Sequence, residues 1–189
     1  TLVHIGEHKA QAVKISVFDY SGSRCDERAV TDPDEFGPPA DETVIWVNVG
    51  GVHKTDMLEA VGRQFALHPL LLEDIANTDQ RPKLDDYEDY LFLVVKMLSL
   101  TDRSDIVVEQ VSFVLGRNYV LSFQENGTDV FQPVRDRLRA GKGRMRQSGA
   151  LSAGGQGDLA RPADERVQEH GRKDDRHADI ELRRELALL

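Results

Sequence analysis

A cluster of carboxylates is the part of this chain whose residue types could bind a metal ion. Hard cations such as Mg²⁺ prefer oxygen ligands, and Mg²⁺ typically keeps several waters while it contacts only one or two carboxylates. Two carboxylates contributed by two different chains would therefore be enough for a magnesium site. The cluster consists of Glu73, Asp74, Asp79, Asp85, Asp86, Glu88 and Asp89.

Glu73 and Asp74 are the candidate metal ligands within this cluster. Neighbouring residues on a helix point about 100° apart, so these two carboxylates cannot both face one small ion directly. This geometry favours a site that is shared with another surface. The spacing alone is also typical of a solvated acidic turn, and we favour that interpretation for the acids from Asp79 to Asp89.

The other reactive side chains do not form a recognisable catalytic set. The six histidines form no HExxH motif, and His68, directly before Pro69, is expected to cap or pack at a helix start. The single Cys25 excludes an intramolecular disulfide and a cysteine zinc cage, and its neighbours predict a surface loop. No serine lies in a GxSxG motif and no base accompanies Cys25, so we expect that the protein is not an enzyme.

Composition is that of an ordinary soluble protein. The 189 residues are 40% hydrophobic and 30% charged, which suits one domain with a real core. A formal net charge of −9 argues against binding to nucleic acids. Residues Thr1–Lys14 do not resemble a signal peptide, and no window approaches the roughly 18 to 20 apolar residues that span a bilayer. We therefore expect a chain that does not itself cross a membrane.

Hydrophobic periodicity predicts strands and helices in mixed order. Arg117–Asn118 is a tight-turn candidate, so the last two strands are expected to pair as a hairpin. The predicted strands are Val13–Val17, Thr43–Val49, Tyr87–Leu100, Val107–Leu115 and Tyr119–Phe123.

Three helices are predicted between and after these strands. The first is capped by Thr55 and presents Leu58, Val61 and Phe65 on one face. The second begins at Pro69 and buries Leu71, Leu72 and Ile75. The third follows Asp129 and carries Phe131, Val134 and Leu138. Ser21–Glu42 is predicted as a loop with a short helix near Asp32–Phe36. The order predicts an α/β fold with a mixed sheet, without the glycine-rich loop of a doubly wound nucleotide fold.

The character of the chain changes after residue 141. Glycine becomes frequent from Lys142 onward and apolar periodicity is lost, which predicts a linker. Lys142, Arg144 and Arg146 are expected to lie in a solvated connector rather than in a phosphate or lipid-headgroup patch. Residues 151–189 are predicted to form a charged, partly helical or disordered tail rather than a second globular domain.

Three segments together resemble the cytosolic amino-terminal domain of the CorA family of divalent-cation transporters. They are WVNVGGVHKTDMLEAVGRQFALHPLLLEDIANTDQRPKLDDYEDYLFLVVKML (Trp46 to Leu98), EQVSFVLGRNYVLSFQE (Glu109 to Glu125) and DVFQPVRDRLRAGKGRMRQSGA (Asp129 to Ala150). The HPLxLEDI, QRPK and YEDYLF motifs are the most specific parts. The resemblance covers residues 1–150, and the tail from 151 to 189 is interpreted as at most a partial stalk helix.

The resemblance implies an α/β/α sandwich that assembles as a homopentamer. It also implies transport of magnesium or cobalt at the inner membrane, on whose cytoplasmic face this domain would lie. Mg²⁺ bound between neighbouring cytosolic domains would hold the pore closed. Asp74 matches the family's carboxylate at that intersubunit site, and Glu73 matches a neighbouring acidic ligand.

The pattern departs from the family after Ala150. LSAGGQGDLARP stands where the family continues into a long stalk, and only IELRRELALL at residues 180–189 echoes its composition. The GMN motif and two transmembrane helices are absent from the sequence, so we expect a soluble fragment that meets the membrane only through missing segments.

Two alternatives stay open. One is a domain of a zinc- or cobalt-handling relative, although softer metals recruit histidine or cysteine and the sequence offers no cluster of them. The other is a stand-alone soluble interaction module that has lost transport.

Overall fold

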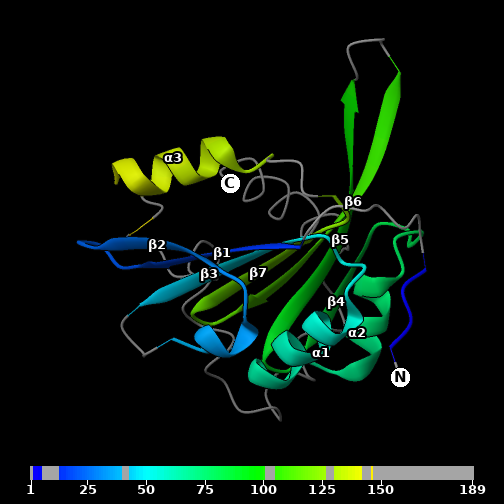
Figure 1. Cartoon of the computed structure of the whole chain (residues 1–189), viewed down its shortest axis with the longest axis horizontal. Helices are drawn as coiled ribbons and strands as arrows, with labels where there is room; N and C mark the ends of the chain where they lie inside the picture. Colours follow the sequence, from blue (N-terminus) through cyan, green and yellow to red (C-terminus); the bar gives the residue numbers. More distant parts are fainter. Residues whose placement is uncertain are drawn as a thin grey trace, which may run out of the picture. The chain divides into compact units, whose positions relative to one another are not determined.

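Seven strands of the computed structural model form one mixed sheet in the order β2-β1-β3-β7-β6-β5-β4 (Figure 1). The structure describes residues 2–5, 13–39, 43–100, 105–126, 130–141 and 146. Neighbouring strands run antiparallel except β3 and β7, which are parallel. The strands are β1 (Lys14–Tyr20), β2 (Cys25–Val30), β3 (Val44–Gly50), β4 (Lys83–Tyr87), β5 (Tyr90–Leu100), β6 (Ile106–Gly116) and β7 (Tyr119–Gln124).

Two strands were missed by the sequence prediction. β2 lies inside the segment predicted as a loop, and Cys25 therefore begins a strand rather than lying in a loop. Its residues CDERAV are mostly exposed, so they lack the apolar alternation that marks a half-buried strand. β4 contains Asp85 and Asp86, which were assigned to a solvated turn. It is an edge strand, where charged residues are common because they discourage pairing with other chains.

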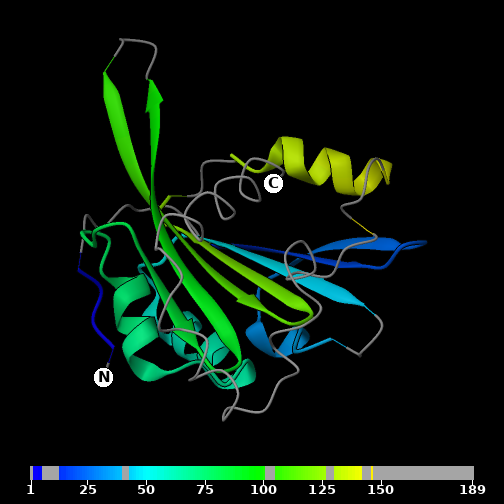
Figure 2. The same ribbon diagram turned by 180° about the vertical axis from the view of Figure 1, so that it is seen from behind.

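Two α-helices and a 3₁₀ helix cover one face of the sheet (Figures 1 and 2). They are α1 (Thr55–Gln64), α2 (Pro69–Ala76) and η1 (Pro33–Glu35). Leu58 and Leu71 are fully buried against strand residues such as Val47 and Phe92. α1 and α2 approach closely at Gly62, where an added Cβ would lie 2.5 Å from Cδ1 of Leu72. The predicted apolar faces of both helices are confirmed.

The ends of these helices agree with the prediction in part. Asp32 forms a capping box with Glu35, which confirms the short helix near Asp32–Phe36. His68 caps α2 and Pro69 occupies its first turn, as expected. Thr55 was predicted to cap α1, but Lys54 holds that position without a side-chain hydrogen bond. The prediction was wrong by one residue because a threonine inside the first turn has the same sequence pattern as a capping one.

The opposite face of the sheet carries α3 (Gln132–Ala140), so the described helices lie on both faces (Figure 2). Leu138 packs with Phe18, Tyr20 and Trp46 in a second, smaller core. Phe131, at the start of α3, makes an edge-to-face contact with Trp46 at a centroid distance of 5.6 Å. The predicted α/β class with a mixed sheet is therefore confirmed.

β5 and β6 pair along their whole length and project beyond the body of the sheet as a two-stranded ribbon (Figure 1). Leu98 and Leu100 on β5 are 71% and 74% exposed, and they stand opposite Val108 and Ile106 on β6. The sequence predicted both strands but not that their ends leave the core, because exposed apolar residues in a strand look like buried ones.

None of the helices in the described part of the chain is long and apolar enough to cross a membrane. Three predicted features lie outside the described residues: the cap at Asp129, the connector at Lys142 and Arg144, and the tail at 151–189. The predicted domain boundary after Ala150 accordingly stays a prediction.

Candidate functional site

Helix α2 carries both sequence-predicted ligands, and its start is built from local interactions. Nδ1 of His68 accepts a hydrogen bond of 3.2 Å from the backbone N–H of Leu70, which satisfies one of the free donors in the first turn. The hydroxyl of Tyr90 accepts a 2.9 Å hydrogen bond from the backbone N–H of His68. His68 therefore holds the helix start in place, and its Nδ1 is used as a cap.

The end of α2 is held by the root of the β5–β6 ribbon. Gln110, which is almost fully buried on β6, donates from Nε2 to the carbonyl oxygens of Asn77 at 3.0 Å and Asp74 at 3.4 Å. The ammonium of Lys96 donates to the carbonyl of Thr78. Carbonyls at a helix end have no partner within the helix, so these bonds fix the segment that carries Asp74.

Asp74 points toward the segment that follows α2. Its Oδ1 accepts a hydrogen bond of 3.0 Å from Nε2 of Gln80, and its Oδ2 lies 2.7 Å from Nζ of Lys83. The Asp74 side chain is 24% exposed and the Lys83 side chain 30% exposed. Each carboxylate oxygen therefore has one donor and keeps further lone-pair capacity at the surface.

Lys83 connects two carboxylates from different elements. Its Nζ lies 2.7 Å from Oδ2 of Asp74 and 2.8 Å from Oδ2 of Asp85 on β4. Burial disfavours the charged form, but the hydrogen bonds to Asp74 and Asp85 outweigh it, and the pKa of Lys83 is raised. The ammonium also lies 5.4 Å from the ring centroid of Phe92. The Lys83 ammonium thus bridges the carboxylates of Asp74 and Asp85.

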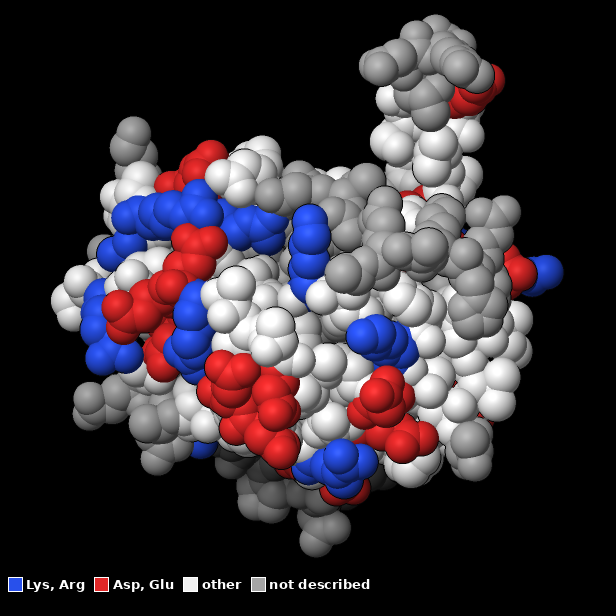
Figure 3. Space-filling model, viewed as in Figure 1, with Lys and Arg blue, Asp and Glu red and all other residues white. Residues whose placement is uncertain are grey.

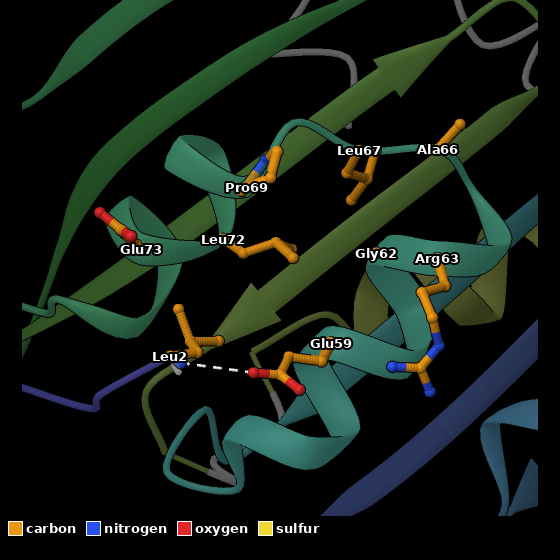
Figure 4. Close-up of a pocket in the computed structure, with 9 residues that line it drawn as sticks. All are labelled: Leu2, Glu59, Gly62, Arg63, Ala66, Leu67, Pro69, Leu72 and Glu73. Atoms are coloured by element: carbon orange, nitrogen blue, oxygen red, sulfur yellow. Dashed lines mark hydrogen bonds between the residues drawn. The ribbon is translucent and has the colours of Figure 1, made fainter.

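Glu73 lies in a different environment from Asp74. It lines a groove of about 490 Å³ between α1 and α2, together with Glu59, Arg63 and Leu72 (Figure 4). Oε1 of Glu59 accepts a 3.3 Å hydrogen bond from the backbone N–H of Leu2. Glu73 and Arg63 lie on opposite sides of this groove in the close-up view. The structure therefore does not bring the two predicted ligands together, in agreement with the angle expected between neighbours on a helix.

The remaining acids of the cluster are distributed over β4 and its flanking turns. Asp85 and Asp86 lie on β4, and Glu88 and Asp89 form the exposed turn to β5. Within the described residues no group of three or more His, Cys, Asp or Glu side chains is arranged to hold a metal ion. Mg²⁺ needs only one or two protein carboxylates in addition to its waters. The donor set at Asp74 fits such an ion only as one part of a shared site.

Three residues around Asp74 were not identified from the sequence. Gln80 and Lys83 follow Asp74 within nine positions, and a lysine this close to a run of acids could have been recognised as their counterion. Gln110 is 36 positions away, and no local pattern connects it to α2. Its role depends on how β6 packs, which only the structure shows.

Cys25 has no role in this region. It lies half-buried at the start of β2, and burial is the largest cause that raises the pKa of its thiol. A raised pKa keeps the thiol protonated and weakly nucleophilic.

Comparisons with known proteins identify the family. A family model described as CorA-like Mg²⁺ transporter protein matches residues 41–155. The cobalt/magnesium transport protein CorA of Thermotoga maritima is 41% identical over 152 residues, which make up 79% of this chain and 43% of that protein. The chain thus spans less than half the length of this relative. These are ion transporters, in agreement with the prediction that the chain is not an enzyme.

Solved structures share the fold at low sequence identity. The full-length CmaX protein has a TM-score of 0.57 at 15% identity, covering 72% of this chain and 42% of its own. The ZntB cytoplasmic domain from Vibrio parahaemolyticus has a TM-score of 0.54 at 10% identity, covering 70% of this chain and 52% of its own. The fold agrees with the stronger sequence match. This chain belongs to the CorA-like family of Mg²⁺ transporter proteins.

Proposed function

We propose that this chain is the cytosolic regulatory domain of a CorA-type transporter of magnesium and cobalt, and that it senses Mg²⁺ through Asp74. The observation that carries the proposal is the position of Asp74. Its carboxylate is held by Gln80 and Lys83 at the surface, with lone pairs left for a ligand from outside. The family match over residues 41–155 supports the transporter assignment.

The site would be completed by a second copy of the chain. Within the described residues, no group of three or more His, Cys, Asp or Glu side chains is arranged to hold a metal ion, and Lys83 occupies the space between Asp74 and Asp85. A neighbouring copy would supply the remaining carboxylate, and a homopentamer would repeat this contact five times. Glu73, on the adjacent face of α2, would contribute to the same contact rather than to the same ion sphere. Segments outside this sequence would anchor the assembly, with this domain on the cytoplasmic side.

Lys83 gives the site a defined state without the ion. When no divalent ion is bound, its ammonium neutralises Asp74 and Asp85. A divalent ion between two copies would offset the repulsion between their acidic surfaces and compete with Lys83 for Asp74. Such an ion shifts the equilibrium between two assembled arrangements only if it binds one of them more tightly. The closed arrangement would be that one.

Mg²⁺ is the ion that suits the donors around Asp74. Asp74 and Asp85, which share Lys83, offer carboxylate oxygens, and Gln80 carries an amide oxygen beside the nitrogen that contacts Asp74; hard cations prefer such oxygen ligands. A zinc-handling relative is the alternative, since one solved structure with this fold is a ZntB cytoplasmic domain. Zinc sites in proteins use histidine and cysteine, and no such cluster lies among the described residues.

Calorimetric titration of the protein with Mg²⁺, Co²⁺ and Zn²⁺ tests this function. Asp74→Asn keeps the shape of the side chain and an oxygen for Gln80 but removes the charge. Asp86→Asn is the matched control, because Asp86 is an exposed carboxylate on β4. We expect Asp74→Asn to abolish Mg²⁺ binding and Asp86→Asn to leave it unchanged. Equal Mg²⁺ binding by the wild type and Asp74→Asn would refute the proposal, and binding of Zn²⁺ alone would favour the zinc-handling alternative.

A further inference from the structure

Helix α2 ends at Ala76, soon after Asp74, and the carbonyls of its last turn need partners from elsewhere in the protein. The chain leaves the helix at Asn77 in an extended conformation, so no left-handed turn of the kind that often ends a helix closes over these carbonyls. The backbone N–H of Ile5 donates to the carbonyl of Ala76 at 3.0 Å. The carbonyls of Asp74 and Asn77 both accept from one side chain, that of Gln110 on β6. The helix end is therefore shaped by residues that are far from it in the sequence.

The side-chain amide of Gln110 is oriented by Lys96. The two residues stand directly opposite each other on β6 and β5. The ammonium of Lys96 can only donate, and it donates to Oε1 of Gln110 at 3.2 Å. Nε2 of Gln110 therefore faces the helix end, where it donates to the carbonyls of Asn77 and Asp74 at 3.0 and 3.4 Å. Gln110 is 2% exposed, and both ends of its amide are used.

This polar pair interrupts an otherwise apolar face of the two strands. Side chains two apart on a strand share a face. On this face of β5, Phe92 and Val94 are fully buried in the core that α1 and α2 cover, and Leu98 is exposed on the ribbon. Lys96 lies between them, where α2 ends. Figure 3 shows that the described part of the ribbon beyond this point is mostly uncharged. The polar side chains of this face are thus placed where they meet helix carbonyls.

The position of the Asp74 carboxylate depends on this helix end. A side chain in the last turn moves with its backbone, and Gln110 holds the backbone carbonyl of Asp74 itself. Gln80 and Lys83, which contact the carboxylate, follow on the segment that leaves the helix. Gln110 also holds the carbonyl of Asn77, where that segment begins. One buried amide thus supports both the carboxylate and the residues that contact it.

Binding of Mg²⁺ is sensitive to such support, because this ion demands near-ideal octahedral geometry. Groups that hydrogen-bond the ligands of a metal, without contacting the metal, typically change its affinity by about 10- to 100-fold when they are replaced. Gln110 acts on the backbone of Asp74 rather than on its carboxylate. The lower end of that range is therefore the effect to expect.

We propose that Gln110 is a positioning residue for the metal site at Asp74, and that through it the root of the β5–β6 ribbon sets the affinity of that site for a divalent cation. The inference rests on the proposed function, because it concerns the same carboxylate. It adds a buried, uncharged residue from a different element, which acts on the ion only through Asp74.

Gln110→Met tests this role, since methionine is about as long, adds no charge and removes both hydrogen-bonding ends. Leu138→Ala is the control for lowered stability, because Leu138 is buried in the second core on the opposite face of the sheet. In calorimetric titration with Mg²⁺, we expect Gln110→Met to bind about tenfold more weakly and Leu138→Ala to bind as the wild type does. Wild-type affinity in Gln110→Met would overturn the proposal. So would equally weakened binding in both variants, since lower stability would then explain the effect.

A second readout needs no ion. The side-chain amide of Gln80 donates to Oδ1 of Asp74 at 3.0 Å, so its NMR signal reports the position of that carboxylate. In ion-free protein, we expect Gln110→Met to shift this signal in the same direction as Asp74→Ala, and Leu138→Ala to leave it in place. An unmoved signal in Gln110→Met would overturn the proposal. If the wild type bound no Mg²⁺, the proposed function would fail, and the Gln80 signal would decide the positioning role by itself.

Gln110→Glu takes the place of Gln110→Met if that variant does not fold. Glutamate keeps an oxygen that accepts from Lys96 but lacks the amino group that holds the carbonyls of Asp74 and Asn77. The same shift of the Gln80 signal is expected. A signal at the wild-type position would refute the role of Gln110.

Discussion

The ammonium nitrogen of Lys83 lies 2.7 Å from Oδ2 of Asp74 and, at the same time, 2.8 Å from Oδ2 of Asp85. One lysine thus joins the end of α2 to the edge strand β4. It takes a position beside Asp74 that a divalent cation would also favour, since both neutralise carboxylates. The ion-free and ion-bound states of the site should therefore differ first in the contacts of Lys83.

Replacing Lys83 with methionine should strengthen the binding of Mg²⁺ several-fold. The substitution removes the ammonium that competes for Asp74 and leaves two unbalanced carboxylates nearby. Without the ion the variant should lose stability, by no more than about 1 kcal/mol because the pair is partly exposed. Calorimetry and thermal unfolding measure the two effects, with Lys54→Met as the control at an exposed lysine. Unchanged Mg²⁺ affinity would show that Lys83 does not compete with the ion.

Ser122→Ala should destabilise the protein by about 1–3 kcal/mol, because it leaves two buried polar groups without their partner. Ser122 accepts from Trp46 and donates to Asn48. Trp46 is the single tryptophan of the chain, so its fluorescence reports both the local change and the unfolding transition. Ser99→Ala, at an exposed position of β5, should leave stability unchanged. Equal unfolding free energies for the two variants would mean that the hydrogen-bond chain contributes nothing.

Leu71→Ala and Leu98→Ala should differ widely in their effect on stability. Leu71 is fully buried on α2, and such truncations cost about 2–5 kcal/mol. Leu98 is 71% exposed on the ribbon, and surface substitutions usually stay within about 0.5 kcal/mol. Urea unfolding of both variants measures the difference. A large loss for Leu98→Ala would indicate that the ribbon face is covered in the folded protein in solution.

Stability should decline at strongly alkaline pH because two tyrosines are held in the neutral form. Burial raises the pKa of Tyr20 and of Tyr119 to about 12, against about 10 for an unfolded chain. Their contribution is therefore complete below about pH 10 and is lost as pH rises toward 12. Denaturant unfolding across this range should show the decline, and Tyr20→Phe should make it shallower. A stability that does not change over this interval would contradict the burial of these hydroxyls.

Most of the fold could be predicted because apolar periodicity marks elements that pack against a core. The strand around Trp46 and the helix that buries Leu71 are of this kind. β2 and β4 could not be predicted in this way. Both lie at the edges of the sheet, and their sequences CDERAV and KLDDY are dominated by polar residues. What places them is pairing with β1 and β5, which is not a local property of the sequence.

The candidate site could be predicted only in part for the same reason. Neighbours on a helix diverge, so the separation of Glu73 from Asp74 followed from the sequence and was found in the structure. The support from Gln110 depends on packing between distant elements. The orientation of Asn48 depends on Trp46 and Ser122, which lie on different strands. Such contacts are set by the register of the sheet.

The proposed role of Asp74 is tested most directly by sedimentation velocity of the wild type and Asp74→Asn, each with and without millimolar Mg²⁺. If Asp74 is half of a metal site shared between copies, Mg²⁺ should increase the sedimentation coefficient of the wild type and leave that of Asp74→Asn unchanged. Asp86→Asn should behave as the wild type does. Mg²⁺-dependent association of equal extent in the wild type and Asp74→Asn would contradict the shared site, and so would its absence from both.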